Sequence, residues 1–314
     1  MSSASKDGRA ARGTAGKVTV GAVNYAGIWA DKAANLEKIE RHIRDAAAVG
    51  VEIVAFPELA VSGYDCSEPP EGRSGPCSLH AESAETIPGP ATDAIHALCR
   101  ELGVYAIVSL PERDPDDAAR LYISAAVIGP EGVVGTHRKT SVIGGRLFCE
   151  PSCFHAGTEV PVFETEHGRI AVLICYELGF VPELTRIAAL KGAQIVFYVS
   201  SSPVGSGKPE YMLQQTGARA TENLIYAVSA NRTGQEPTRS YYGHSNIAGP
   251  TYPRLYRPLA QATDREELIY ATLDMAAIDA WADQFNPAEH VNWDLISHEY
   301  AELAKRLGAA TAPR

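Results

Sequence analysis

The sequence predicts an α/β fold in which β-sheets are covered by helices. One strand–helix–strand unit spans residues 18–56, and a second unit with different spacing spans residues 169–201. Each unit joins short apolar runs through an amphipathic segment, the pattern of a sheet packed under helices. Two such sheets placed face to face would carry helices on both outer surfaces. No low-complexity linker divides the chain, so we expect a flexible tail at 1–16 and a single domain with a C-terminal extension at 17–314.

Strands and helices continue to alternate through the first half of the chain. Strands are expected at 18–25 and 51–56, joined by a helix at about 31–49 that ends at Gly50. A loop rich in Gly, Pro and Ser occupies about 62–90. A helix at 90–102 then leads to a strand at 104–112, and residues 121–129 and 133–139 read as a hairpin around a Pro-Glu-Gly turn.

The second half of the chain shows the same alternation of strands and helices. A strand is predicted at 168–177, followed by a helix that begins at Pro182 and ends before Gly192, and by a strand at 193–201. The remaining predicted elements are a helix at 208–223, a strand with a turn at 224–234, a late strand at 270–276 and an amphipathic helix at about 291–307.

The composition is that of an ordinary globular protein with an acidic balance. Hydrophobic residues make up 45% of the chain and charged residues 21%, and the net charge is −10. This charge argues against a nucleic-acid partner, which would need a basic patch. No apolar run approaches the roughly 20 residues of a membrane span. The N-terminal tail lacks the apolar core of a secretory signal, so a cytoplasmic location is expected.

Six cysteines are too few for a disulfide scaffold. The spacing of Cys149 and Cys153, and the loop position of Cys66 and Cys77, leave a zinc site or a loop disulfide open. No paired metal-binding motif supports zinc, and buried unpaired thiols are the favoured interpretation. We therefore expect no metal.

Three reactive residues stand at the ends of predicted strands. Glu58 follows the strand at 51–56, Lys139 ends the hairpin, and Cys175 lies near the end of the strand at 168–177. Sites assemble at such strand ends because loops there vary over a rigid frame. Taken singly, each residue has a commoner explanation: a solvated glutamate, an exposed lysine or a small buried thiol.

The sequence around these residues resembles a known family. AFPEL, HRKT and LICYE occur in that order and are followed by ALKGA, GARATEN, SANRTG and GHSNIAGP. Between about residues 17 and 276, this series resembles the nitrilase, or carbon–nitrogen hydrolase, superfamily. The resemblance implies a four-layer α-β-β-α sandwich and a catalytic Glu58–Lys139–Cys175 triad. It also implies that no cofactor is needed.

The implied chemistry suits these residue types. An ordinary thiol is mostly protonated at neutral pH, so Glu58 is expected to take the proton of Cys175, aided by a pKa raised through burial. Lys139 and the backbone N–H of Tyr176 would stabilise the oxyanion. The acyl group would pass to the thiol, the amine or ammonia would leave, and water would hydrolyse the thioester.

A second glutamate is expected from the same resemblance. In the string RLFCEPSCFHAG, Glu150 lies four residues before Phe154, and Gly157 follows, a spacing similar to the family's ExxxFxxG pattern. We predict that Glu150 positions the substrate or assists as an acid. The alternative is a surface glutamate in a loop.

The residues after the nucleophile leave the substrate open. Cys-Tyr-Glu at 175–177 departs from the Cys-Tyr-Asp of most amidase branches and from the Cys-Trp-Glu of nitrilases, and Leu-Gly-Phe at 178–180 lacks the basic residue or aromatic pair of carbamoylases. We rank a small carboxamide first, a nitrile second and an N-carbamoyl amine third. The predicted substrate-binding residues are Tyr64, Phe154, Tyr176, Glu177, Phe180 and Ser201.

Other classes of function remain open. A non-catalytic scaffold is disfavoured because the three reactive residues are intact. An acyltransferase that passes the thioester to an amine would use the same residues. A papain-like hydrolase would need a histidine partner, and the nearest candidate, His137, lies in no recognisable motif. Finally, members of the superfamily pair through helices, so we expect a homodimer or larger assembly through the helix after Cys175 and the C-terminal segment.

Overall fold

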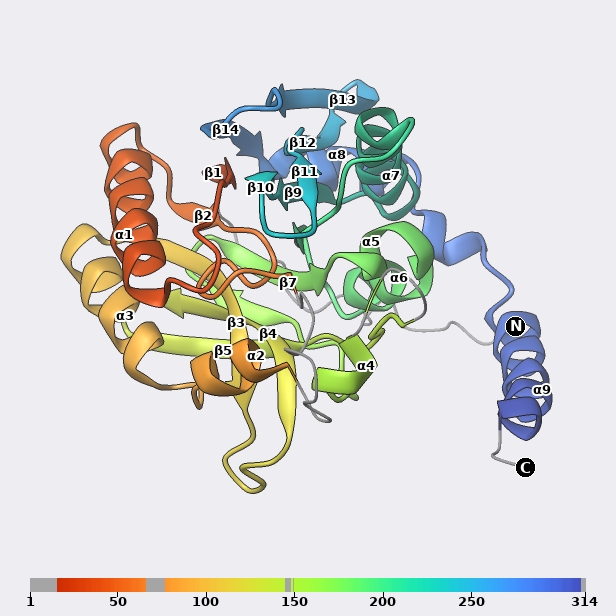
Figure 1. Ribbon diagram of the computed structural model, residues 1–314. Coiled ribbons are helices and arrows are strands. Elements are labelled where there is room, and N and C mark those ends of the chain that lie inside the picture. The colour runs from red at the N-terminus through yellow and green to blue at the C-terminus, as the bar shows by residue number, and fades with distance from the viewer. Residues whose placement is uncertain (1–15, 66–76, 145–147, 149, 312–314) are drawn as a thin grey trace, which may run out of the picture.

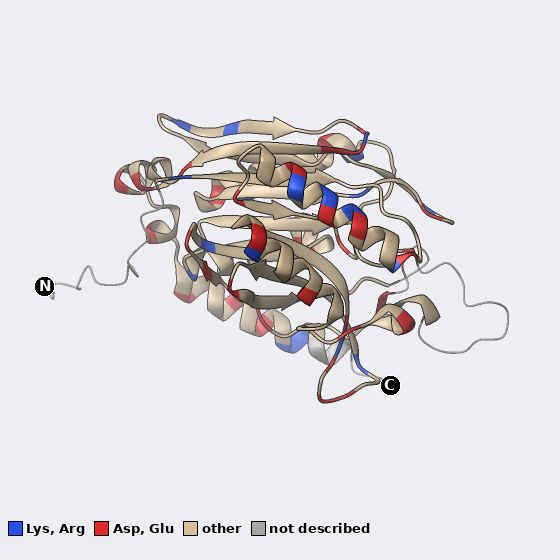
Figure 2. Ribbon diagram, turned by 90° about the vertical axis from the view of Figure 1, so that its left-hand side faces the viewer, with Lys and Arg blue, Asp and Glu red and all other residues tan. Residues whose placement is uncertain are grey.

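The computed structural model describes residues 16–65, 77–144, 148 and 150–311. Within these residues, two six-stranded sheets pack face to face, and helices cover both outer surfaces (Figure 1). Charged residues gather on the outer helices and loops (Figure 2). The predicted α-β-β-α sandwich is therefore confirmed. Of the predicted tail at 1–16, only Gly16 is described, and its carbonyl accepts a hydrogen bond from Met275 N–H at 3.3 Å.

The first sheet has the strand order β14-β1-β2-β3-β4-β5. Strands β1, β2 and β3 are parallel to one another, whereas β14, β4 and β5 are added antiparallel. The late strand predicted at 270–276 is β14, which pairs with β1 along its whole length. The bounds are β1 Lys17–Asn24, β2 Ile53–Ala55, β3 Tyr105–Arg113, β4 Leu121–Gly129, β5 Gly132–Arg138 and β14 Glu267–Asp274.

The second sheet has the order β13-β12-β9-β8-β7-β6, with β7, β8 and β9 parallel. Its bounds are β6 Phe163–Thr165, β7 Gly168–Ile174, β8 Ile195–Ser200, β9 Tyr226–Asn231, β12 Asn246–Thr251 and β13 Arg254–Gln261. A small ribbon of β10 (Thr233–Gln235) and β11 (Ser240–Tyr242) lies beside it. In both sheets the parallel strands end on the side where the reactive residues follow them.

The helices begin and end where local chemistry allows. Asp31 caps the first long helix by accepting from Ala34 N–H, and Pro90 opens the next, which Gly103 closes with a φ of 68°. The bounds are α1 Lys32–Ala48, α2 Ser78–Ser83, α3 Pro90–Leu102, α4 Glu150–Cys153, α5 Tyr176–Phe180, α6 Pro182–Leu190, α7 Lys208–Asn223, α8 Met275–Gln284, η1 Pro287–His290 and α9 Trp293–Thr311. In Figure 1, α9 stands apart from the two sheets.

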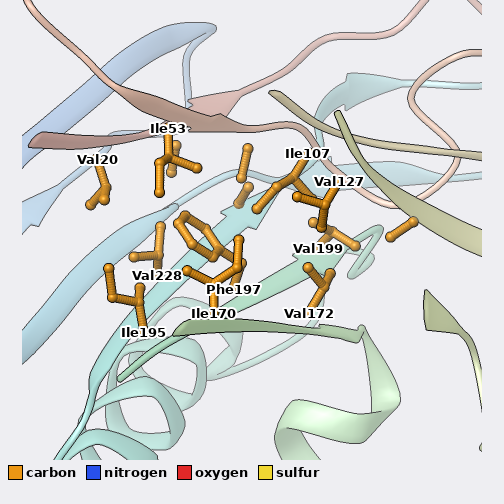
Figure 3. Packing of buried hydrophobic residues seen from close by; sticks show 14 of the residues in the cluster. Val20, Ile53, Ile107, Val127, Ile170, Val172, Ile195, Phe197, Val199 and Val228 are labelled. Atoms are coloured by element: carbon orange, nitrogen blue, oxygen red, sulfur yellow. The ribbon is translucent and has the colours of Figure 1, made fainter. Parts of the chain in front are cut away.

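The main core lies between the two sheets. Val20, Ile53 and Ile107 of the first sheet face Ile195 and Phe197 of the second (Figure 3). Two further cores lie outside the sheets, one under α1 and α3 and one under α5, α6 and α7. Because both faces of the central strands are covered, these strands read in the sequence as continuous apolar runs rather than alternating ones.

Two sequence expectations are corrected by the structure. The strand predicted at 168–177 ends at Ile174, because Cys175 has a φ of 52° and α5 begins directly after it. The C-terminal helix starts at Trp293 rather than near 291 and continues to Thr311. Among the described residues, no helix combines the length and the apolar character that a membrane span requires.

Candidate active site

Four of the predicted site residues meet at one end of the sandwich. Glu58 follows β2, Lys139 directly follows β5, Glu150 opens α4 and Cys175 directly follows β7. The side chains of Glu58, Lys139 and Glu150 are almost fully buried, while Cys175 is partly exposed. Residues far apart in the sequence are thus brought together because the parallel strands of both sheets end at the same edge.

Lys139 lies between the two glutamates. Its Nζ donates to Glu58 Oε1 at 2.8 Å and to Glu150 Oε1 at 2.7 Å. Glu150 is held in turn by the Tyr64 hydroxyl at 2.6 Å and by the backbone N–H of Ile143 at 2.9 Å. A buried ammonium with two carboxylate partners has little freedom to move, so this cluster fixes the position of the lysine.

Glu58 is oriented by residues of the second sheet. Ser201 N–H donates to Glu58 Oε2 at 3.1 Å, and the Ser201 hydroxyl donates to the Glu58 carbonyl at 2.8 Å. Arg232, fully buried, donates to the same carbonyl at 3.1 Å and forms an ion pair with Glu236 at 2.9 Å. The carboxylate of the first sheet is therefore held in place from the second sheet.

Cys175 occupies the sharp turn between β7 and α5. Its φ of 52° and ψ of −100° lie outside the regions that non-glycine residues favour, and its N–H is fixed to Val199 O at 2.9 Å. Strained backbone of this kind occurs at functional sites, where the surrounding structure enforces it. At this turn Cys175 forms part of the lining of a cavity.

The buried charges shift one another's protonation. Burial raises the pKa of Glu58 above its ordinary value, although the adjacent Lys139 opposes this. Burial and the charge of Glu58 raise the pKa of the Cys175 thiol, again against the attraction of Lys139. Burial alone would lower the pKa of Lys139, but the two carboxylates raise it well above its usual range. The resting cluster therefore holds a neutral thiol, a permanent ammonium and a carboxylate of increased basicity.

Glu177 lies behind the reactive residues. It is fully buried and accepts hydrogen bonds from Ile174 N–H at 2.7 Å and from the N–H and hydroxyl of Thr140, both at 2.6 Å. His137 Nε2 lies 2.9 Å from Glu177 Oε2, the oxygen that also accepts from Ile174 N–H, whereas Thr140 donates to Oε1. Burial alone would raise the pKa of Glu177, but attraction to His137 and these hydrogen bonds lower it to about 2. Glu177 thus links Thr140, which follows Lys139, to Ile174, which precedes Cys175.

Cys175 opens into a cavity of about 720 Å³. Of the predicted substrate-binding residues, Tyr176 and Phe180 line it, whereas Tyr64, Phe154, Glu177 and Ser201 are buried outside its described lining. The described lining consists of Val142, Ile143, Gly144, Phe148, Cys175, Tyr176, Leu178, Gly179, Phe180, Ser200, Ser202, Pro203, Lys208, Tyr211 and Met212. The walls are thus mainly apolar and aromatic.

Lys208 and Tyr211 are lining residues that sequence reasoning missed. Both lie in the first turn of α7, a helix that the sequence did predict. The signal available was a lysine at a helix N-terminus, where the helix dipole disfavours a cation. Nothing in the sequence alone places that turn against the cavity, because its position depends on how α7 packs against the second sheet.

The other predicted thiol and metal features give no second site in the described residues. Cys77, Cys99 and Cys175 have free thiols, and Cys77 N–H donates to Cys153 Sγ at 3.1 Å. Cys66 and Cys149 lie outside the described residues. Among the residues that the structure describes, no group of three or more His, Cys, Asp or Glu side chains is arranged to hold a metal ion.

Comparison with known proteins gives the family. The model of the carbon-nitrogen hydrolase family matches residues 19–283. An omega-amidase, NIT2, from Danio rerio is 31% identical over 253 residues, which cover 78% of this chain and 84% of the relative. A nitrilase from Pyrococcus abyssi is 32% identical over 243 residues, which cover 77% of this chain and 84% of the relative.

Solved structures agree with this assignment. Nit3 of Saccharomyces cerevisiae, a member of branch 10 of the nitrilase superfamily, superposes with a TM-score of 0.73 at 25% identity, covering 85% of this chain and 94% of that one. An amidase from Nesterenkonia sp. gives a TM-score of 0.71 at 23% identity, covering 92% and 97%, and at this identity the likeness concerns the fold alone. The chain therefore belongs to the carbon-nitrogen hydrolase family of the nitrilase superfamily and is a hydrolase of non-peptide carbon–nitrogen bonds.

Proposed function

We propose that the protein hydrolyses a small carboxamide to the carboxylic acid and ammonia through a thioester on Cys175. The observation that carries this proposal is the geometry of Lys139, held between Glu58 and Glu150 beside a thiol that opens into an apolar cavity. Such a cluster supplies a base, a fixed positive charge and a nucleophile in one place.

In the first half of the reaction, Glu58 accepts the proton of Cys175 as sulfur attacks the amide carbon. The developing oxyanion is stabilised by the Lys139 ammonium and by the backbone N–H of Tyr176. Loss of one oxyanion donor typically lowers the rate by about 10²–10³-fold. The proton then passes from Glu58 to the amide nitrogen, the carbon–nitrogen bond breaks, and ammonia leaves.

In the second half, water hydrolyses the thioester. Glu58 takes a proton from the water as the oxygen adds to the thioester carbon. The carbon–sulfur bond then breaks, and Glu58 returns the proton to the thiolate, which gives the acid and the thiol. Glu150 positions Lys139 and stabilises its charge through both steps, a role supported by the 2.7 Å contact between them. Because Glu150 also bonds Ile143 N–H, it fixes one part of the cavity wall as well.

The names of the relatives include an amidase and a nitrilase, so they fit both an amide and a nitrile as substrate. The omega-amidase from Danio rerio matches most of this chain, as does the nitrilase from Pyrococcus abyssi. A nitrile is therefore the second candidate substrate, an N-carbamoyl amine is the third, and transfer of the acyl group to an amine in place of water remains an alternative outcome of the same thioester.

The test is a substrate panel with two variants. Primary amides, the matching nitriles and N-carbamoyl amines are incubated with the wild-type protein, Cys175→Ala and Glu58→Gln, and ammonia release and intact mass are recorded. We expect ammonia from amides, none with Cys175→Ala, and at least a hundredfold loss with Glu58→Gln. Faster release from nitriles would overturn the choice of amide, and a stable thioester discharged only by an added amine would indicate a transferase.

We also propose that the protein forms a homodimer through α6 and α9. Side chains on these helices form an exposed apolar surface in the described part of the chain, comprising Ile187, Leu190, Trp293, Leu295, Ile296, Tyr300, Leu303 and Leu307. Pro182, Ile187, Trp293 and Ile296 line a groove of about 540 Å³ between the two helices. An exposed apolar surface of this extent favours association, and a two-fold pair is the commonest assembly.

A further inference from the structure

Two buried charged side chains contact the loop that carries Glu58 without taking part in the proton transfers above. Arg232 joins β9 to β10, and Glu236 lies in the turn between β10 and β11. Each side chain is 1% exposed, and Arg232 Nη1 lies 2.9 Å from Glu236 Oε1. Taking two charges out of water is unfavourable even when they pair, so stability alone does not explain this ion pair. What the pair holds in place is therefore the feature to explain.

Arg232 holds the first end of the loop at 58–65. Its Nη2 donates to the carbonyls of Glu58 at 3.1 Å and Leu59 at 3.0 Å, and its Nε donates to the Ser201 hydroxyl at 3.1 Å. Leu59 is fully buried and has a φ of 51°, which a bulky side chain rarely adopts. Strained backbone persists only where the surrounding contacts enforce it. Arg232 supplies such contacts directly after the base.

Glu236 holds the other end of the same loop. It accepts from Tyr64 N–H at 3.1 Å and from Asp65 N–H at 2.7 Å, so two successive backbone donors meet one carboxylate. The Tyr241 hydroxyl donates to it as well, at 2.7 Å. Gly63 permits this close approach, because its φ is 92° and a Cβ there would lie 3.0 Å from Glu236 Oε1.

Both ends of this loop lead to Lys139. At the first end, Glu58 Oε1 accepts directly from the ammonium at 2.8 Å. At the other end, the Tyr64 hydroxyl donates to Glu150 Oε1 at 2.6 Å, and this same oxygen accepts from Lys139 at 2.7 Å. The path of the loop between its two ends therefore helps to set where the two carboxylates lie around the lysine.

We propose that the Arg232–Glu236 ion pair positions both glutamates around Lys139 by holding the two ends of the loop at 58–65. The inference rests on the proposed function, because it concerns the base and the second glutamate of that reaction. Neither member of the pair belongs to the described lining of the cavity, so both are positioning residues. Loss of the pair should lower kcat and leave KM almost unchanged, since a small misplacement of reacting groups slows chemistry without removing a contact with the substrate.

The first test is Glu236→Gln, which keeps the shape of the side chain and removes its charge. We expect kcat for an amide that the wild type hydrolyses to fall by about 10- to 100-fold and KM to stay within about twofold. Both are measured at a temperature where circular dichroism shows the variant to be fully folded. The matched control is Glu85→Gln, because Glu85 also pairs with a lysine, Lys32, and accepts a backbone N–H, that of Ala91, at 2.7 Å. This control should lower the melting temperature and leave kcat unchanged.

A double variant and a background variant make the test independent of folding defects. Glu236→Gln leaves Arg232 unpaired in the interior, whereas Arg232→Met with Glu236→Gln leaves neither charge of the pair. The double variant should fold and show the same fall in kcat. Tyr64→Phe removes the hydroxyl that holds Glu150, so Glu236→Gln should lower kcat by a smaller factor in that background than in the wild type. Unchanged kcat in the folded double variant, or equal loss in both backgrounds, overturns the proposal.

Alkylation of Cys175 tests the ion pair without a substrate. The rate of reaction with iodoacetamide is followed by peptide mass at Cys175, with Glu58→Gln as the reference for a missing base. We expect slower alkylation in Glu58→Gln and in Glu236→Gln, and the wild-type rate in Glu85→Gln. This pattern supports the positioning role even if no amide is hydrolysed, in which case only the amidase proposal fails. A wild-type rate in Glu236→Gln overturns the positioning role and leaves the amidase proposal standing.

Discussion

At the scale of single residues, the site conserves its total charge. Glu58, Lys139 and Glu150 form a buried cluster beside the partly exposed Cys175. Moving a proton from the thiol to Glu58 changes where the negative charge is but not how much there is. In a low-dielectric interior this matters, because creating a new charge would cost far more than relocating one. This constant net charge supports Glu58 as the base and Cys175 as the nucleophile, in addition to the order of the sequence motifs.

Glu177 offers a prediction at the same scale. Its pKa in the folded protein is about 2, below its ordinary value of 4.5. A depressed pKa contributes stability that is complete above the ordinary value and is lost as pH falls toward about 2. The shift corresponds to about 3 kcal/mol at neutral pH. Glu177→Gln should therefore lower the free energy of unfolding strongly at pH 7 and much less near pH 3, measured by urea titration.

The same variant tests whether Glu177 positions the reactive loops. Since it joins Thr140 to Ile174, its loss should lower kcat and slow alkylation of Cys175 while KM changes little, and Glu177→Asp should recover part of kcat. A destabilisation that is equal at every pH, or an effect on KM alone, would contradict this role.

At the scale of elements, the strands and helices can be predicted from the sequence better than the lining of the cavity. Glu58 and Cys175 could be placed from the sequence because each follows an apolar run that is buried on both faces. Lys139 follows the edge strand β5, which is only partly buried, so its placement depends on the motif around it. Short elements such as α5 and β11 carry too few residues for a periodic pattern. The lining of the cavity depends on the packing of α7 and α5 against the second sheet, which no local pattern records. Lys208 and Tyr211 could therefore not be predicted.

Gly157 shows how an element constrains the site. Its N–H donates to Lys139 O at 2.7 Å, and a Cβ added to it would lie 2.3 Å from Arg138 O. Gly157→Ala should therefore push the end of β5 outward, costing about 1–3 kcal/mol and displacing Lys139. Thermal unfolding and kcat/KM would show it. Gly16→Ala is the control, since a Cβ there meets nothing within 4 Å, and equal behaviour of the two variants would exclude a steric role for Gly157.

At the scale of the whole molecule, the apolar surface of α6 and α9 is the feature that the monomer leaves unexplained. No described side chain of α9 is buried, although Leu295 is 54% exposed and Tyr300 is 51% exposed. Isolated apolar side chains on a surface are ordinary, but a set gathered along two neighbouring helices is not.

If the protein dimerises through this surface, a mutation in the surface should change the mass of the particle in solution. Leu190→Asp would place a charge in the buried interface and should convert the dimer to a monomer, as measured by light scattering after size-exclusion chromatography. Val49→Asp, at an exposed apolar residue beyond α1, should leave the mass unchanged. A wild-type protein that is monomeric at micromolar concentration would refute the assembly.

Arg232 has a consequence that reaches beyond its own contacts. It follows a strand of the second sheet and donates to the carbonyls of Glu58 and Leu59, which follow a strand of the first. Base and lysine are thus carried by one half of the sandwich and the nucleophile by the other. The alignment needed for chemistry therefore depends on how closely the two halves fit, and so on the packing of the apolar interior between them.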